Sequence, residues 1–366
     1  MRDPAQAAVV QLLQAAVDTV YPAAVLCSGR HTVELEVAVG AASPQTWFDL
    51  ASLTKALSTS VLAMQLHDAG KLTLEDEVLP GVRVWHLLSH CSGLPACFPP
   101  LFAQHQGLLD APSVHTRQAV IRAAQAATRT PVATQAVYSD LGFILLGDFL
   151  EQRGQARLDQ QLEQWLQPLR LALSFLPLTG EKPQPVDCAQ TRRESPAREL
   201  LTGVVHDDTA RAMLGVAGHA GLFGTARAVF DLAQLLLACY HGDRAAQHAL
   251  RVSAATVQRF FAPVLVPGLR TTWGLGWDHP DPHPPAGSDA GSTSSAGRLW
   301  SRAGVGHLGF TGCSVWLDPA LRAVAVLVSN RVCVATSAEA EQTKAGMRRL
   351  RPQLHDALML SWQQPR

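Results

Sequence analysis

Apolar residues recur along the first part of the chain in two different patterns. Over residues 1–22 (MRDPAQAAVVQLLQAAVDTVYP) they return at the spacing of an amphipathic helix. Segment 23–40 is instead rich in β-branched residues and is broken by Ser-Gly-Arg, which predicts a two-stranded hairpin. We therefore expect a helix followed by two paired strands.

Helical patterns dominate the middle of the chain. Asp49 opens a helical stretch that Gly70 ends, and both residues are of types preferred at those positions. Two further helices are predicted over 140–153 and 225–241, the first with Asp140 as its N-cap. The segment between the hairpin and the C-terminal strands is thus a long helical insert.

Strand character returns towards the C-terminus. Segment 271–280 (TTWGLGWDHP) is predicted to be a strand, and 281–297 a flexible polar surface loop. Beyond it, FTGCSVWLDP and RAVAVLVSNRVCV predict two strands joined by an Asp-Pro-Ala-Leu turn, and 338–361 predicts a helix.

This order of elements predicts an α/β fold. An antiparallel sheet is flanked by the N- and C-terminal helices, and a mostly helical lobe is inserted between its strands. We expect residues 1–50 and 265–366 to form the sheet domain and residues 51–264 the helical domain.

Composition narrows the classes of partner. The 366 residues carry 30 Lys+Arg against 30 Asp+Glu, which argues against a nucleic-acid or anionic-membrane partner. No apolar run approaches the ~18 residues of a membrane span. Because residues 1–22 do not resemble a signal peptide, we expect a cytoplasmic location, or a periplasmic one if a signal has been removed. The seven cysteines include no C-x-x-C pair, which favours free thiols.

The sharpest chemical signal is Ser52-Leu53-Thr54-Lys55. Residues three apart share a helix face, so Lys55 should lie beside the Ser52 hydroxyl. A serine is a weak nucleophile that needs a nearby base, and a lysine can serve where burial lowers its pKa. The chain has only four lysines, at positions 55, 71, 182 and 344. An S-x-x-K tetrapeptide by itself also arises by chance.

A second signal is Tyr138-Ser139-Asp140, which stands before a predicted helix. By itself, the motif is typical of a tyrosine packed near a helix start, with Asp140 acting only as the N-cap.

A third signal, Gly304-Val305-Gly306-His307-Leu308-Gly309, matches the G-x-G-x-x-G dinucleotide fingerprint. That fingerprint should follow a strand and open a helix, whereas here a strand is expected, so we reject a dinucleotide site. A glycine-lined strand would instead let an extended substrate approach the backbone.

Together these signals resemble the serine β-lactamase and penicillin-binding-protein superfamily, and most closely its class C-like branch, which includes DD-peptidases and esterases. Their order and spacing resemble the S-x-x-K, Y-x-N and K-T-G elements of that superfamily. Further segments that resemble the branch are FDLA before Ser52, HLLSHCSGLP (86–95), GVVHDDTARAMLGVAGHAGLFGTA (203–226) and WGLGW (273–277). The resemblance implies a β-lactamase/transpeptidase-like fold with the active site between the two domains.

Carried over by position, the resemblance makes Ser52 the acylated nucleophile and Lys55 its proton acceptor or positioning partner. Tyr138 would be the other candidate base, and sequence leaves the choice between them open. The backbone N–H groups of Ser52 and Phe310 would form the oxyanion hole, since Phe310 directly follows Gly309.

Two positions depart from the family pattern. His307 stands where classical β-lactamases have lysine, and a mostly neutral imidazole attracts a substrate carboxylate less. Asp140 stands where many members have asparagine, and a carboxylate cannot donate a hydrogen bond. His206, Asp207 and His219 are interpreted as residues that fix loops by hydrogen bonding.

The resemblance implies a cofactor-free, metal-free serine hydrolase that acts through an acyl-enzyme on Ser52. Its substrate would be a small molecule or peptide: an ester, a D-amino-acid peptide or amide, or less efficiently a β-lactam. Two alternatives stay open, an acyltransferase that uses the same acyl-enzyme and a catalytically silent penicillin-binding sensor. The sequence leaves the oligomeric state open.

Overall fold

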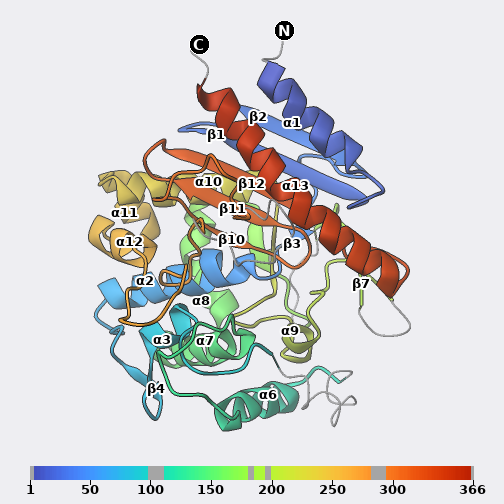
Figure 1. Ribbon diagram of the computed structural model, residues 1–366. Coiled ribbons are helices and arrows are strands. Elements are labelled where there is room, and N and C mark those ends of the chain that lie inside the picture. The colour runs from blue at the N-terminus through green and yellow to red at the C-terminus, as the bar shows by residue number, and fades with distance from the viewer. Residues whose placement is uncertain (1–3, 98–110, 180–184, 194–198, 282–293, 364–366) are drawn as a thin grey trace.

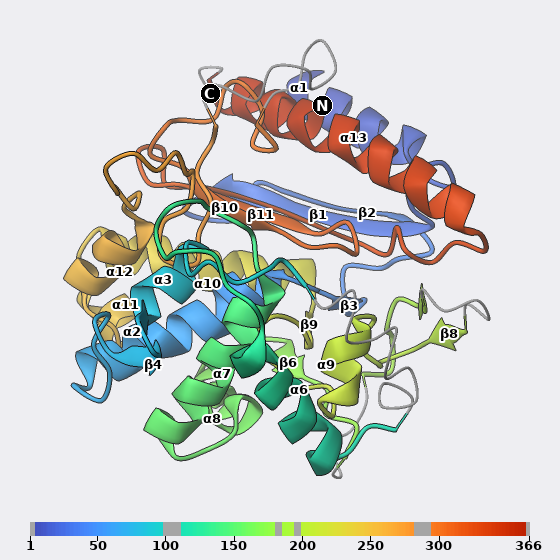
Figure 2. The same ribbon diagram turned by 60° about the horizontal axis from the view of Figure 1, so that its bottom comes forward.

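The two ends of the chain form one layer of the molecule. The computed structural model describes residues 4–97, 111–179, 185–193, 199–281 and 294–363. Helix α1 (Pro4–Ala15) packs beside the long helix α13 (Ser337–Gln363), and both lie across the same face of a sheet (Figures 1 and 2). Most of the predicted loop 281–297 lies outside the described residues.

The sheet under these helices has five antiparallel strands in the order β10-β11-β12-β1-β2. Their bounds are Ala23–Arg30 for β1, Leu35–Gly40 for β2, Val305–Leu308 for β10, Ser314–Asp318 for β11 and Ala323–Ser329 for β12. In the centre, β1 pairs with β12 from Ala24↔Ser329 to Arg30↔Ala323. The predicted hairpin and the two late strands therefore meet in one sheet, which confirms the predicted fold class.

Strand β12 shows why the sheet is covered on both faces. Val324, Val326 and Val328 belong to the core shared with the helical lobe. Their neighbours in the strand, including Ala325 and Leu327, belong to a second core under α1 and α13. Side chains alternate between the faces of a strand, so an uninterrupted apolar strand needs partners on both sides.

The helical lobe lies against the opposite face of the sheet through α10 (Ala226–Tyr240). Its other helical elements, in chain order, are η1 (Lys55–Ser60), α2 (Val61–Asp68), α3 (Val84–Leu88), α6 (Val114–Ala126), α7 (Asp140–Gly154), α8 (Leu158–Leu166), η2 (Gln167–Leu169), α9 (Asp208–Ala212), α11 (Arg244–Leu250) and α12 (Ala254–Phe261). Short strands complete it: β3 (Phe48–Asp49), β4 (Glu77–Leu79), β5 (Val82–Arg83), β6 (Leu173–Phe175), β7 (Thr191–Arg192), β8 (Leu200–Leu201) and β9 (Leu222–Gly224).

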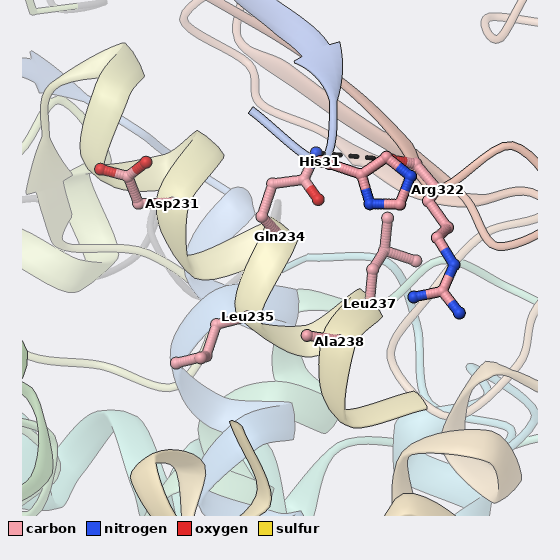
Figure 3. A pocket seen from close by; sticks show the side chains of 7 residues that line it. All are labelled: His31, Asp231, Gln234, Leu235, Leu237, Ala238 and Arg322. Atoms are coloured by element: carbon pink, nitrogen blue, oxygen red, sulfur yellow. Dashed lines mark hydrogen bonds between the residues drawn. The ribbon is translucent and has the colours of Figure 1, made fainter. Parts of the chain in front are cut away.

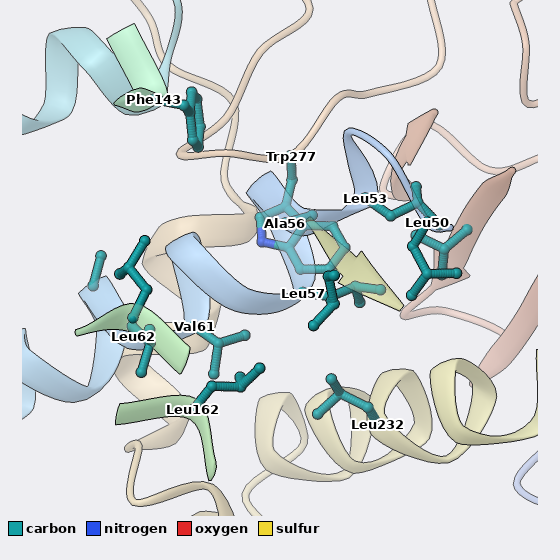
Figure 4. Close-up of a cluster of buried hydrophobic side chains, with 14 of the residues drawn as sticks. Leu50, Leu53, Ala56, Leu57, Val61, Leu62, Phe143, Leu162, Leu232 and Trp277 are labelled. Carbon is teal, nitrogen blue, oxygen red and sulfur yellow. The ribbon is translucent and has the colours of Figure 1, made fainter. Parts of the chain in front are cut away.

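A dense apolar cluster anchors the segment that carries the S-x-x-K motif. Leu53, Leu57 and Val61 are fully buried among side chains from α7, α8, α10 and Trp277 (Figure 4). Burial of each such leucine or valine contributes about 1.5–3 kcal/mol. This packing fixes the helical segment that presents Ser52 and Lys55.

One expectation about the late segments is wrong. Segment 271–280 is not a strand, because it makes only isolated bridges at Trp273 and Asp278, and Gly276 turns the chain with a φ of 83°. The approach of a substrate to the glycine-lined strand stays a prediction, but two of its glycines also have a packing role. A Cβ at Gly306 would lie 2.3 Å from the Trp316 ring, and one at Gly304 would lie 2.3 Å from Trp300, so both serve packing.

Within the described residues, no helix combines the length and apolar character needed to cross a membrane.

Candidate active site

The turn that carries Ser52 is held by a buried carboxylate. Ala51, directly before it, has a φ of 48°, a left-handed conformation that costs a non-glycine residue about 1–2 kcal/mol. Asp49 accepts hydrogen bonds from the Ala51 N–H at 2.8 Å and from the His206 N–H at 2.7 Å. Burial raises the pKa of Asp49 to about 6, although these two bonds oppose the shift. The prediction that Asp49 opens the helical stretch is wrong: it ends the short strand Phe48–Asp49, and its carboxylate stabilises the turn before the helix.

Lys55 is fully buried beside Ser52, as the spacing predicts. Its Nζ donates to Ser52 Oγ at 2.9 Å and to the carbonyl oxygen of His219 at 3.1 Å, and lies 2.7 Å from Asp140 Oδ1. An ammonium group has three N–H bonds, which these acceptors share with the Tyr138 hydroxyl.

The charge on Lys55 differs from the sequence expectation. Burial alone would lower its pKa, but the Asp140 carboxylate and the Tyr138 phenol outweigh burial, and the net pKa is raised. Lys55 is therefore a protonated ammonium group in this site rather than a free amine. A buried lysine needs such a counter-charge to stay protonated.

The helical segment after Ser52 is a π-helix over its first turn and a half. Lys55–Ser60 forms η1, and the Ser60 hydroxyl donates to the Lys55 carbonyl oxygen at 2.7 Å. Single π-turns inside helices occur often at functional sites.

Asp140 is not the N-cap of α7. Ser139 takes that position and accepts the Gly142 N–H at 3.1 Å, while Asp140 is the first helical residue. The prediction is wrong by one residue, because serine caps as well as aspartate does. Freed from capping, the Asp140 carboxylate faces Lys55.

Tyr138 completes the group around Ser52. Its ring lies 4.8 Å from Lys55 Nζ. Burial raises the pKa of Tyr138, while the Lys55 charge and hydrogen bonds with Lys55 and Ser52 act in the opposite direction. The net direction is upward, so the resting group is a neutral phenol.

Three further rings surround Tyr138. Its ring centroid lies 4.6 Å from that of His90, 5.6 Å from that of Trp273 and 6.0 Å from that of His307. Trp273 in turn lies 4.4 Å from His90 and 5.5 Å from His307. We call these four residues the aromatic cluster.

His307 is buried on β10 and neutral. Burial, helped by the Lys55 charge, lowers its pKa to about 3. Its Nδ1–H donates to the Leu308 carbonyl oxygen at 2.8 Å, since a carbonyl can only accept. The expectation of a mostly neutral histidine agrees with this environment.

The turn after β10 approaches the Ser52 turn closely. A Cβ at Gly309 would lie 2.7 Å from the Leu50 carbonyl oxygen, so only glycine fits there. Among the hydrogen bonds of the described residues, neither the Ser52 N–H nor the Phe310 N–H has an acceptor. The Phe310 side chain is 44% exposed, with the buried Arg331 guanidinium 4.5 Å from its ring centroid.

The loop histidines make contacts of the expected kind. His219 Nε2 lies 2.9 Å from Asp207 Oδ1, and Asp207 also accepts the Ala210 N–H at 2.7 Å as the N-cap of α9. Burial would raise the pKa of Asp207, but the charge of His219 and its hydrogen bond to the carboxylate hold that pKa well below its usual range. This pair fixes the loop whose His219 carbonyl meets Lys55.

No group of three or more His, Cys, Asp or Glu side chains in the described part of the chain is arranged to hold a metal ion. A cavity of about 300 Å³ lies away from Ser52, between α10 and the turns at the ends of β1 and β12 (Figure 3). It is lined by His31, Asp231, Gln234, Leu235, Leu237, Ala238 and Arg322. None of these residues belongs to the group around Ser52.

The structure thus brings Ser52, Lys55, Tyr138 and Asp140 together, with His307, Gly309 and Phe310 on the facing strand and turn. Sequence reasoning missed two contacts. The His219 carbonyl bond to Lys55 is a backbone interaction that no side-chain pattern reveals. The packing of His90 on Tyr138 could have been sought in the HLLSHCSGLP segment, which was given only as one of the segments that resemble the family branch. The catalytic roles stay predictions.

Comparison with known proteins places these observations in a family. The family described as "Beta-lactamase" matches residues 8–345. An "N-acetylmuramyl-L-alanine amidase" of Bacillus subtilis (strain 168) is 30% identical over 324 residues, 78% of this chain and 68% of that protein. A "Putative D-alanyl-D-alanine carboxypeptidase" of Escherichia coli (strain K12) is 29% identical over 79% of this chain and 70% of its own.

A solved structure shares the fold at lower identity. "EstCE1, a hydrolase with promiscuous acyltransferase activity" superposes with a TM-score of 0.68 at 21% identity, over 95% of this chain and 98% of that one. This likeness supports the arrangement of sheet and helices described above.

Proposed function

The chain belongs to the β-lactamase family, and we propose that it is a serine hydrolase that acts through an acyl-enzyme on Ser52. The observation that carries the proposal is the contact of a fully buried, ion-paired Lys55 with the Ser52 hydroxyl at 2.9 Å. A purely structural lysine has no need to be buried against a serine, because burial of an ammonium is costly.

The proton path we propose runs through Tyr138. Lys55 is already an ammonium paired with Asp140 and has no lone pair to accept a proton, so the Ser52 proton has to go elsewhere. The Ser52 Oγ–carbon bond forms as its proton passes to Tyr138 Oη, and the phenol proton passes to the leaving oxygen or nitrogen as that bond breaks. Tyr138 ends as it began, a neutral phenol, and Lys55 stabilises charge that develops on its oxygen.

The second half of the reaction uses the same path in reverse. A water loses a proton to Tyr138 as it attacks the acyl carbon, and Ser52 regains a proton when it leaves. The free N–H groups of Ser52 and Phe310 are placed on two turns that touch through Gly309, which supports their use as the oxyanion hole.

For the substrate we propose an ester or a small amide, with a D-amino-acid amide ahead of a β-lactam. His307 is neutral where a lysine would attract a carboxylate, so a penicillin has less to bind. The names of the amidase and carboxypeptidase relatives favour an amide. The name of the EstCE1 structure favours an ester, and keeps acyl transfer to an alcohol or amine as the second candidate.

Intact-protein mass spectrometry after treatment with a fluorophosphonate, and separately with a penicillin, tests the acyl-enzyme. We expect a covalent adduct that maps to Ser52 and is absent in Ser52→Ala. Ser58→Ala is a matched control, because Ser58 is buried in the same helical segment and its hydroxyl has no partner among the described residues. If the folded protein forms no adduct with either reagent, the proposal is disproved and a catalytically silent protein is favoured.

A panel of p-nitrophenyl esters, D-alanyl-D-alanine peptides and a chromogenic cephalosporin then ranks the substrate classes. Added alcohol or amine acceptors separate hydrolysis from acyl transfer, since a transferase forms the acylated acceptor in place of the free acid.

A further inference from the structure

His90 holds the backbone on both sides of Tyr138. Its carbonyl oxygen accepts the Val137 N–H at 2.9 Å, and its ring Nδ1 accepts the Ser139 N–H at 3.0 Å. One residue thus receives the two amide groups that flank Tyr138, from a position far away in sequence.

The ring of His90 also packs on the Tyr138 side chain, with 4.6 Å between the centroids. Phe143 and Trp273 contact the other parts of the same imidazole, at 5.1 Å and 4.4 Å between centroids. His90 is 2% exposed and its backbone has a φ of 58°. A strained, buried position is kept only where its surroundings over-determine it.

The imidazole can do this only while neutral. Burial, together with the charge of Lys55, holds the pKa of His90 well below its usual range. Nδ1 accepts from Ser139, so the proton of the neutral ring is on Nε2. The acceptor that Ser139 needs is therefore present near neutral pH.

We propose that His90 is a positioning residue that sets the place of the Tyr138 hydroxyl between Ser52 and the leaving group. The inference rests on the proposed function, because the position of Tyr138 affects the rate only if Tyr138 carries a proton. A displacement of about 1 Å in such a group can cost roughly a hundred-fold in rate.

The test is a double-mutant cycle between His90 and Tyr138, read as the rate of Ser52 labelling by a fluorophosphonate. We expect His90→Ala to slow labelling by about a hundred-fold, but by less than about two-fold when Tyr138→Phe is already present. His90→Asn should fall between wild type and His90→Ala. Asparagine tolerates the left-handed conformation, and its side-chain oxygen can accept the Ser139 N–H. It therefore restores the hydrogen bond to Ser139 but not the ring packing on Tyr138.

His86→Ala is the matched control. His86 is also buried, its ring centroid lies 3.9 Å from that of Trp85, and its Nδ1 accepts the Arg83 N–H at 2.9 Å. It shares the chemistry of His90 but has no ring contact with Tyr138 among the described residues. We expect it to lower stability and leave labelling within about two-fold. An equal loss of labelling for His90→Ala with and without Tyr138 would show a structural role and overturn the inference.

A second readout works without any reaction. The chain has three tyrosines, at positions 21, 138 and 240. NMR of ring-labelled tyrosine gives three signals, of which Tyr138→Phe identifies one. His90→Ala should shift that signal alone, and His86→Ala should shift none. If the Tyr138 signal does not shift in His90→Ala, the inference is overturned even when the wild-type protein is labelled normally. If the signal shifts but the wild-type protein is not labelled, the proposed function is wrong and the contact between His90 and Tyr138 is not.

Discussion

Two buried basic residues lie near Ser52, Lys55 on its own helical segment and His307 on β10, and their pKa values are shifted in opposite directions. Lys55 is buried against Asp140 at 2.7 Å, and its pKa is raised. His307 is buried against its own neighbouring carbonyl and near the Lys55 charge, and its pKa falls to about 3. A buried base keeps its proton when a carboxylate is in contact with it and loses it otherwise.

This contrast shapes the chemistry of the site. The cation that touches Ser52 is already paired, and the position on β10 where relatives with lysine carry a second cation is neutral. Under the proposed mechanism, charge in this part of the site serves the proton path rather than the capture of an anionic substrate.

The largest effect should follow removal of the paired cation. Lys55→Met takes away the donor to Ser52 and leaves the Asp140 carboxylate without its partner, so we expect labelling and turnover to fall by roughly 1,000-fold or more. Lys55→Arg should also be nearly inactive, because the larger guanidinium does not fit the fully buried position beside Ser52. The measurement is the second-order rate of labelling by a fluorophosphonate.

Lys71→Met serves as the control, since Lys71 is an exposed lysine at the end of the same helical segment. It should label as wild type does. If Lys55→Met kept a tenth of the wild-type rate, the ion pair would be a stabilising feature with no part in the reaction.

How far the sequence could predict the structure depends on how local each feature is. The hairpin, β12 and the Ser52–Lys55 contact follow from spacing within a few residues, and they were predicted. The contact between Lys55 and Asp140 joins two distant segments, so neither the direction of the lysine pKa shift nor the ion pair itself could be derived from the sequence. The packing role of the glycines at 304 and 306 could not be derived either, because their neighbours, Trp300 and Trp316, are known only from the fold.

The next effect should follow removal of the counter-charge. Asp140→Asn takes away the largest influence that raises the pKa of Lys55, so that pKa should fall. If Lys55 works as an ammonium, the alkaline limb of kcat/KM moves to lower pH, and activity near pH 9 drops relative to activity near pH 7. A variant that is more active than wild type at pH 8–9 would identify Lys55 as the free base.

The same substitution has a signature in stability. A lysine with a raised pKa in the folded state stabilises the fold fully below its unfolded pKa of 10.5, and this stabilisation is lost as the pH rises through the folded value. The difference in urea midpoint between wild type and Asp140→Asn should therefore be constant from about pH 7 to 10 and shrink above that range. Asp148→Asn, on the same helix and bonded to Gln152, should show no such dependence.

The smallest effect should come from the neutral side. With a pKa of about 3, His307 is already uncharged at pH 5, so His307→Gln should leave the pH profile between 5 and 9 unchanged and lower ester turnover by only a few-fold.

His307→Lys tests the same position with a cation. The charge of Lys55 repels the new ammonium group, so the pKa of the introduced lysine should lie below that of a free lysine. Even a partly charged lysine should speed acylation by a penicillin by up to about ten-fold relative to a neutral ester. The ratio of the two acylation rates is the measurement. If His307→Lys does not change this ratio, a group other than residue 307 limits the use of anionic substrates. If His307→Gln loses an acid limb of the pH profile, the imidazole titrates in the working range.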